Sequence, residues 1–243
     1  MDPKQHWESV YRKRDPAQAS WYQAEATLSL ALIRNAAPPW AVVLDVGGGS
    51  STLVDGLLAT GYHGVTVLDI SSAALDHARR RLGDAAHEVN WMVADILTAV
   101  LPDHGVDVWH DRAVFHFLTS ATDRERYVSQ VKGAMRAGGV VLVATFADDG
   151  PTRCSGLPVE RYSAGELHGQ FGPDFRLIAS RREEHVTPQG VVQAFVYCLC
   201  RYEPGPRAGS GGQEQPEAQE ADRDTDDLPE ALARKSEQHS LAQ

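Results

Sequence analysis

The chain between residues 41 and 147 alternates between short apolar runs and longer amphipathic stretches. Five of the apolar runs have the length and the β-branched content of buried strands. Three of the stretches between them carry apolar residues at helical spacing, with serine, threonine or glycine near their ends. The predicted strands span residues 41–46, 64–70, 88–96, 106–114 and 140–147, and the predicted helices span residues 51–61, 71–83 and 122–139.

Strands that alternate with helices predict crossover connections and therefore a parallel sheet. The pattern changes after residue 147, where a Gly-, Pro- and Ser-rich loop precedes a short helix with a Ser163-x-x-Glu166 capping box. Residues 175–202 then form two predicted strands around a turn at residues 187–190. We therefore predict an α/β protein with a doubly wound, mostly parallel seven-stranded sheet that ends in an antiparallel C-terminal hairpin.

Three segments follow from this pattern. Residues 1–36 are predicted to form an N-terminal helical cap outside the alternating region, and residues 37–203 to form the domain that contains the sheet. Residues 204–243 are rich in Gly, Pro, Gln and acidic residues. Such a segment cannot bury enough apolar surface to offset its ordering entropy, so we predict a disordered acidic tail.

The net charge of −10 is concentrated near the C-terminus. Residues 203–243 contain ten acids and four bases, so the first 202 residues carry only −4. Nothing in this distribution predicts a nucleic-acid-binding face. No run approaches the roughly 20 apolar residues of a membrane span, and the N-terminus lacks the apolar core of a signal peptide. We expect a cytoplasmic protein with no nucleic-acid or membrane partner.

The three cysteines, Cys154, Cys198 and Cys200, are too few and too unevenly spaced for a disulfide framework. Cys198 and Cys200 would share one face of a strand. A C-x-C pair could bind a metal ion, but no second pair completes a site. The sequence therefore favours buried thiols, and no metal site is predicted.

The clearest candidate for chemistry is the stretch VVLDVGGGSSTLVDGL, residues 42–57, where the first predicted strand meets a helix. In doubly wound sheets ligands bind at the carboxyl ends of the strands, and glycines let the backbone approach them closely. The helix that follows offers N–H groups and a positive dipole end. A dinucleotide fingerprint, G-x-G-x-x-G, fits Gly47 and Gly49 but fails at Thr52. Asp45 would also face a pyrophosphate unfavourably, and suits a ligand with an ammonium group and no phosphate.

The segment from Asp45 through Gly47 and Gly49 to Ser51 resembles motif I, D-x-G-x-G-x-G, of the class I S-adenosylmethionine-dependent methyltransferases. Ser51 stands in place of the third glycine. The glycine turn before residues 140–147 also resembles the family, and the resemblance extends over about residues 20–200. It implies a Rossmann-like methyltransferase fold and S-adenosylmethionine as the cofactor.

The resemblance also assigns binding residues at the ends of the next two strands. Asp69 matches the family's acid that bonds the ribose hydroxyls, as a carboxylate can accept two such bonds, and Ile70 follows it in the predicted site. Asp95 and Ile96 match the acid and apolar pair around the adenine. Trp21 is a further predicted cofactor contact, in a segment with Tyr22 and Gln23, because N-terminal helices often cover the cofactor in this family and an aromatic ring can face a sulfonium.

The remaining aromatic residues near the N-terminus have a simpler interpretation. Trp7 and Tyr11 are spaced i to i+4, so we expect them to form one helix face packed on the sheet.

Polar residues follow the fourth predicted strand, where the family places the transferred methyl group. His110, Asp111 and His116 are candidate general bases for the acceptor, and Arg112 lies among them. A base is not obligatory, because proximity alone can contribute about 7–11 kcal/mol. Further acceptor-pocket candidates are expected at the same end of the sheet: Cys154, Arg161, Tyr162, His185 and Gln193.

The acceptor is the least constrained prediction. The W-x-x-x-Y and SWYQ layout is similar to a group that includes protein-lysine methyltransferases, which usually carry a K-G-T-x-D-like segment after the fourth strand. This chain has Asp111-Arg-Ala-Val-Phe-His116 there, which favours a small-molecule acceptor such as a metabolite, thiol or chalcogen. A protein lysine acceptor and a non-catalytic cofactor-binding scaffold remain alternatives, and a dinucleotide-dependent reductase is the least favoured one.

Overall fold

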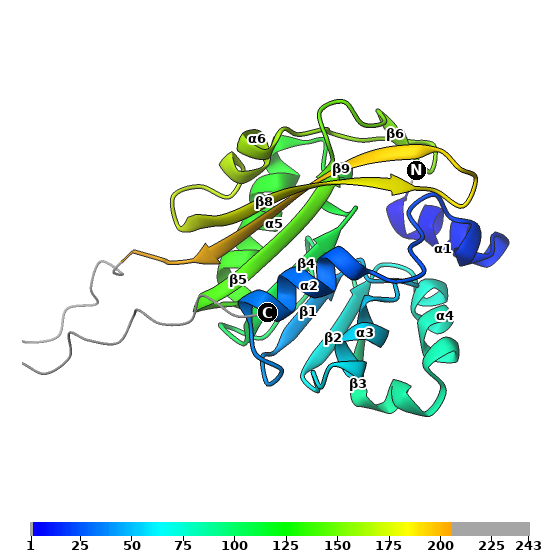
Figure 1. Ribbon diagram of the computed structural model, residues 1–243, viewed down its shortest axis with the longest axis horizontal. Helices are drawn as coiled ribbons and strands as arrows, with labels where there is room; N and C mark the ends of the chain where they lie inside the picture. Colours follow the sequence, from blue (N-terminus) through cyan, green and yellow to red (C-terminus); the bar gives the residue numbers. More distant parts are fainter. Residues whose placement is uncertain (1, 206–243) are drawn as a thin grey trace, which may run out of the picture. The chain divides into compact units, whose positions relative to one another are not determined.

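The computed structural model describes residues 2–205, and a seven-stranded mixed sheet forms its centre (Figure 1). The strand order is β3-β2-β1-β4-β5-β9-β8. Neighbours from β3 to β5 are parallel, whereas β9 pairs antiparallel with β5 and β8. This topology confirms the predicted fold class. The strands are β1 Val43–Val46, β2 Val65–Asp69, β3 Val89–Val93, β4 Val106–Arg112, β5 Met135–Phe146, β8 Phe175–Val186 and β9 Val192–Tyr202.

Helices cover both faces of the sheet, each over its own buried apolar cluster. Because side chains alternate along a strand, Val43 joins the cluster on one face and Leu44 the cluster on the other. The first face carries α2 (Thr27–Ala36), α3 (Leu53–Ala59) and α4 (Ser72–Leu82); the second carries α5 (Ala121–Ala134) and α6 (Ala164–Gly169).

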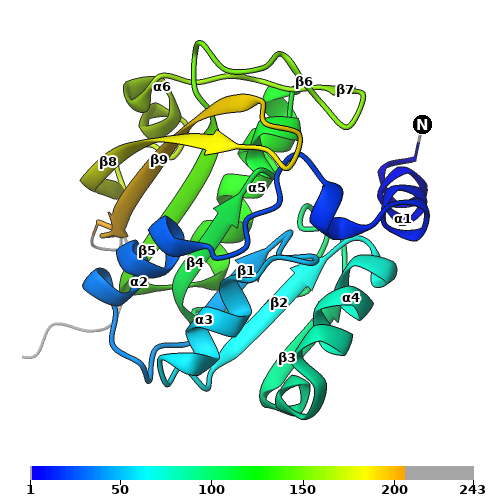
Figure 2. The same cartoon turned by 45° about the vertical axis from the view of Figure 1, so that its right-hand side comes forward.

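The strand order reverses at β1, whose neighbours are β2 and β4. Asp45 of β1 therefore lies beside Val67 on one side and His110 on the other. Such a switch point opens a crevice at the carboxyl ends of the strands. Helix α1 (Pro3–Lys13) lies beside α4 (Figure 2), where the Ser71 hydroxyl donates a 2.7 Å hydrogen bond to the Glu8 carboxylate.

Several predictions from local sequence signals are confirmed in the structure. Ser71 caps α4 by accepting a hydrogen bond from the Ala74 amide at 3.2 Å. The capping box of Ser163 and Glu166 is complete at the start of α6. The hairpin of β8 and β9 turns at residues 187–190, where Gly190 has a φ of +79° that favours glycine.

Several elements differ from the predictions. The helix predicted to reach residue 139 ends at Ala134, because the fully buried Met135 pairs with Val106 and starts β5. Strand β4 ends at Arg112, because Ala113 turns the chain with a φ of +74°. The predicted loop after residue 147 contains a small hairpin, β6 Arg153–Cys154 and β7 Leu157–Pro158.

Of the predicted disordered tail, residues 206–243 lie outside the described part of the chain. Among residues 2–205 there is no helix with both the length and the apolar character needed to cross a bilayer.

Candidate functional site

The glycine turn after β1 brings the backbone against the side chains at the end of β2. Gly47 and Gly49 have φ values of +64° and +45°, a region that L side chains rarely adopt. A Cβ atom on Gly49 would lie 2.8 Å from Oδ2 of Asp69 and 3.0 Å from the Tyr11 hydroxyl. Glycine is therefore required at this position by both conformation and space.

Asp69 is the last residue of β2 and faces a cavity at this end of the sheet. Its Oδ1 accepts a 2.8 Å hydrogen bond from the Ser71 amide. Burial raises the pKa of Asp69 to about 7, and the nearby carboxylates of Asp45 and Glu8 act in the same direction. Hydroxyl donors from a ligand would therefore stabilise the ionised form of this carboxylate.

Asp95 and Ile96 line the same cavity just beyond β3, together with Ile70. Oδ1 of Asp95 accepts a 2.9 Å hydrogen bond from the Leu97 amide, which fixes the turn. Ile96 is buried and the neighbouring Ala94 is also part of the wall. This half of the cavity therefore combines an apolar slot with carboxylates at its ends.

The cavity has a volume of about 320 Å³, within the usual range of small-molecule sites. Aromatic side chains close its outer side: Trp7 of α1 lies 5.1 Å from the Phe117 ring and 5.8 Å from the Trp21 ring between centroids. Trp21, the predicted cofactor contact, lines this cavity. Trp7 and Tyr11, which we expected only to pack on the sheet, also line the cavity.

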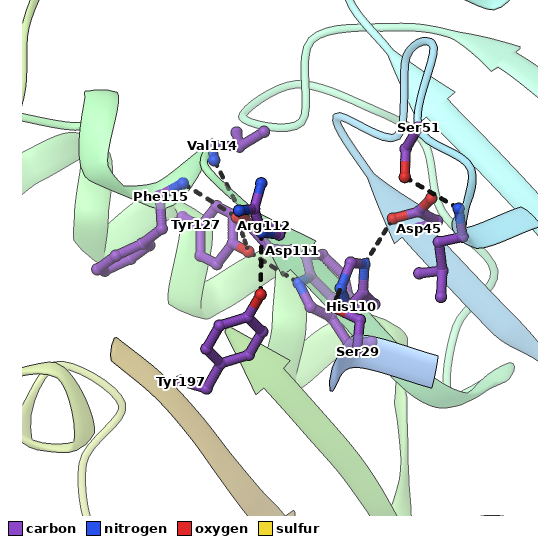
Figure 3. Close-up of polar contacts among 12 residues, drawn as sticks. Ser29, Asp45, Ser51, His110, Asp111, Arg112, Val114, Phe115, Tyr127 and Tyr197 are labelled. Carbon is purple, nitrogen blue, oxygen red and sulfur yellow. Dashed lines mark hydrogen bonds and ion pairs between the residues drawn. The ribbon is translucent and has the colours of Figure 1, made fainter. Parts of the chain in front are cut away.

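Asp45 and His110 form a buried pair behind the glycine turn (Figure 3). Nδ1 of His110 lies 2.7 Å from Oδ1 of Asp45, and Nε2 lies 2.9 Å from the Ser29 hydroxyl. Both ring nitrogens are therefore engaged by the protein. His110 and Ser51 line a second, smaller cavity of about 40 Å³ on the other side of the turn.

Asp111 points into the core on the opposite face of β4. Its carboxylate accepts hydrogen bonds from the Val114 and Phe115 amides at 2.8 and 3.0 Å and from the Tyr127 hydroxyl at 2.6 Å (Figure 3). Burial raises its pKa to about 6. The structure does not bring this side chain into the lining of either cavity, because it is occupied in holding the turn after β4.

His116 is also fully buried and absent from both cavity linings. Its Nδ1 accepts a 3.4 Å hydrogen bond from the Phe146 amide, and its ring packs against Phe117 and Phe146. Burial lowers its pKa to about 3. The placement of His116 is that of a neutral core side chain, whereas the sequence made it a candidate general base.

The acceptor-pocket candidates also fall partly inside and partly outside the cavity linings. Cys154, on the β6–β7 hairpin, lines the large cavity, and burial raises its thiol pKa to about 12. Arg161, Tyr162, His185 and Gln193 line neither cavity. Arg112, to which the sequence gave no role, lines both. Strand alternation could have indicated this, because Arg112 falls on the same face of β4 as His110.

The cysteines of β9 lie in the core. Cys198 and Cys200 are buried with their sulfur atoms 3.3 Å apart. Across residues 2–205, no three or more His, Cys, Asp or Glu side chains are grouped so that they could hold a metal ion.

Comparisons with known proteins agree with this geometry. A family model described as a methyltransferase domain matches residues 43–139. An uncharacterized methyltransferase of Mycobacterium tuberculosis is 36% identical over 104 residues, which cover 43% of this chain and 50% of the relative. The eEF1A lysine and N-terminal methyltransferase of Danio rerio is 24% identical over 163 residues, covering 66% of this chain and 23% of the relative. The chain thus spans half or less of the length of these relatives.

A solved structure has the same fold. The 1,6-didemethyltoxoflavin-N1-methyltransferase of Burkholderia thailandensis, with 1,6-didemethyltoxoflavin and S-adenosylhomocysteine bound, superposes with a TM-score of 0.61 at 17% identity. The superposition covers 83% of this chain and 84% of that protein. At this identity the likeness establishes the arrangement of the sheet and helices, and leaves the acceptor open.

Proposed function

This chain belongs to the class I S-adenosylmethionine-dependent methyltransferase family, and we propose that it transfers a methyl group from S-adenosylmethionine to a small-molecule acceptor. The observation that carries the proposal is the convergence of Asp69, Asp95 and the glycine turn of β1 on one cavity. These groups come from three neighbouring strands, at the switch point where this fold binds ligands.

The residues present fit the cofactor. Asp69 offers a carboxylate to the ribose hydroxyls, and Asp95 offers one to the exocyclic amine of the adenine, beside the apolar Ile96. Gly47 and Gly49 let the aminoacyl arm approach the backbone. When bound, S-adenosylmethionine supplies an electrophilic methyl group whose bond to sulfur breaks as the acceptor's lone pair forms the new bond.

The other half of the cavity supports an apolar acceptor of small size. It is walled by aromatic and aliphatic side chains, which would exclude water from the reacting atoms. The large cavity contains no histidine among the lining residues of the described chain, and the Cys154 thiol, with a pKa of about 12, is a poor proton acceptor. The apolar side chains of this half are Trp7, Trp21, Phe117, Leu118, Leu157 and Pro158, and the lining also includes Thr119 and Asp123.

Since no histidine of the described chain lines this cavity, and Asp69 and Asp95 are assigned to the cofactor, we propose that the acceptor reacts from a lone pair that it already carries. A thiolate or another soft nucleophile meets this condition without help. A lysine ammonium first has to lose a proton, which is why we place a protein-lysine acceptor second, although the Danio rerio relative is named for that activity. A non-catalytic scaffold is the third alternative.

Methyl transfer from radiolabelled S-adenosylmethionine into a cell lysate, followed by separation of products by size, tests the acceptor class. We expect label in the small-molecule fraction with the intact protein, and none with an Asp69→Asn variant. Label confined to protein bands would refute the small-molecule acceptor, and cofactor binding without any transfer would favour the scaffold.

A further inference from the structure

Arg112 lies at the junction of the two cavities at the carboxyl end of β4. Tyr11, Trp21, Gly47 and Arg112 line both the cavity of about 320 Å³ and the cavity of about 40 Å³. The small cavity is therefore the continuation of the large one past the glycine turn. Among the lining residues of the described chain, Arg112 is the only arginine or lysine in either cavity.

The guanidinium of Arg112 is held in one orientation. Its Nε donates a 2.9 Å hydrogen bond to the Tyr197 hydroxyl, and its Nη1 donates a 3.1 Å bond to the Trp21 carbonyl. The group also lies 4.1 Å from the centroid of the Phe195 ring. An arginine has five N–H donors, and the contacts on the protein side use three of them. Two donors remain for a ligand in the cavity.

Glu183 acts as the counter-ion from behind, at a distance of 3.4 Å from Nη2 of Arg112. The same carboxylate also accepts closer hydrogen bonds from the Tyr197 hydroxyl at 2.8 Å and from the Gln23 amide at 3.0 Å. The charge of Arg112 acts on the lining of the large cavity, where it favours a lower pKa of the Cys154 thiol against the larger, opposite effect of burial.

Two other groups near the turn that could attract an anion are already occupied. Helix α3 has only seven residues, and its first amide, that of Leu53, donates to the Ser51 hydroxyl at 3.1 Å. His110 is engaged by Asp45 and Ser29 through its two nitrogens. For an anionic group of a ligand that extends past Gly47, Arg112 is therefore the cationic side chain with which it can pair.

We propose that Arg112 binds the carboxylate of the aminoacyl arm of S-adenosylmethionine, through the two N–H donors that the protein leaves open. The inference rests on the proposed function. It follows from the position of Arg112, which lines both cavities together with Gly47, whereas the ribose is assigned to Asp69 in the large cavity. The fixed fork of an arginine suits a carboxylate better than a lysine would.

Two ligands that differ only in the carboxylate test this assignment: S-adenosylhomocysteine and its decarboxylated analogue, S-adenosyl-3-thiopropylamine. In calorimetry the wild-type protein should prefer S-adenosylhomocysteine by about 10- to 100-fold, the range of hydrogen bonds to a charged group. Arg112→Met, which keeps an unbranched apolar stem over Phe195, should bind the two ligands equally. Arg112→Lys should retain an intermediate preference.

Arg201→Met is the matched control, because Arg201 lies away from the carboxyl ends of the parallel strands. Its side chain donates a hydrogen bond to the Gly138 carbonyl, and its backbone pairs with Val140 of β5. It should keep the full preference. The assignment is overturned if the Arg112 variants weaken both ligands equally, or if they keep the wild-type preference. If Arg112→Met does not fold, Arg112→Lys decides by the same criterion. Failure of the wild-type protein to bind either ligand would refute the proposed function itself. This outcome differs from failure of the Arg112 assignment, in which the wild-type protein still binds S-adenosylhomocysteine.

Discussion

Asp45 and His110 are joined across β1 and β4 by a 2.7 Å contact between Oδ1 and Nδ1, although 65 residues separate them in the chain. Ser29 engages the other ring nitrogen. The acid at the start of the glycine motif is therefore bonded within the protein, and the imidazole is occupied at both nitrogens. The pair links the glycine turn to β4 and to α2.

Removing the imidazole should destabilise the protein, because a buried carboxylate then loses its partner. We expect His110→Phe to lower the free energy of unfolding by about 3–5 kcal/mol in chemical denaturation. Ser29→Ala, which removes only the outer hydrogen bond, should cost about 1 kcal/mol. Equal stability of His110→Phe and the wild-type protein would show that the contact contributes nothing.

Cofactor affinity should depend on pH through Asp69. Its pKa is raised to about 7 by burial, so the side chain is protonated in the ligand-free protein below that pH. Ribose hydroxyls donate to the ionised form, so binding of S-adenosylhomocysteine should weaken as pH falls from 8 to 5.5, approaching tenfold per pH unit at the acid end. Calorimetry across this range measures the effect. Asp69→Asn should bind weakly at every pH, and a flat wild-type profile would contradict the role of Asp69.

Asp111 should prove to be structural. Tyr127 donates a 2.6 Å hydrogen bond to its carboxylate, so Tyr127→Phe should lower the free energy of unfolding by about 1–3 kcal/mol. Because this group does not line the cavity, kcat should stay within about twofold of the wild-type value at a temperature where the variant is folded. A large loss of kcat with a changed pH profile would instead support Asp111 as the general base.

Helix α1 should control release of the cofactor. Glu8 accepts hydrogen bonds from the Ser71 and Ser72 hydroxyls at 2.7 and 3.1 Å, and the same helix presents Trp7 and Tyr11 to the cavity. We expect Glu8→Ala to raise the dissociation rate of S-adenosylhomocysteine about 3- to 10-fold in stopped-flow tryptophan fluorescence. Glu125→Ala, an exposed substitution on α5, is the control. Unchanged dissociation in both variants would separate α1 from ligand release.

Much of the fold follows from local signals. The strands of the parallel part were predictable because each is a short apolar run, and the turn at Gly190 because glycine adopts its φ of +79° without strain. The early start of β5 was not predictable, since residues 135–139 continue a helical pattern and are drawn into the sheet by pairing with β4.

The lining of the cavity was predictable where a residue lies at or just beyond the end of a strand, as Asp69 and Asp95 do. The roles of the polar residues at the end of β4 were not predictable, because they depend on the face of the sheet to which each side chain points. Asp111 points to Tyr127 in the core, whereas Arg112, one residue later, points to the cavities. The contribution of α1 to the cavity wall was also not predictable. It depends on docking between segments far apart in sequence, and the local sequence around Trp7 and Tyr11 does not indicate that contact.

The most direct test of the central claim is calorimetry of the intact protein with S-adenosylhomocysteine at pH 8, where Asp69 is ionised. We expect one binding site with a dissociation constant in the micromolar range or below, and at least about 100-fold weaker binding by Asp69→Asn. Absence of binding to the folded wild-type protein, beside normal binding by a known methyltransferase, would contradict the account.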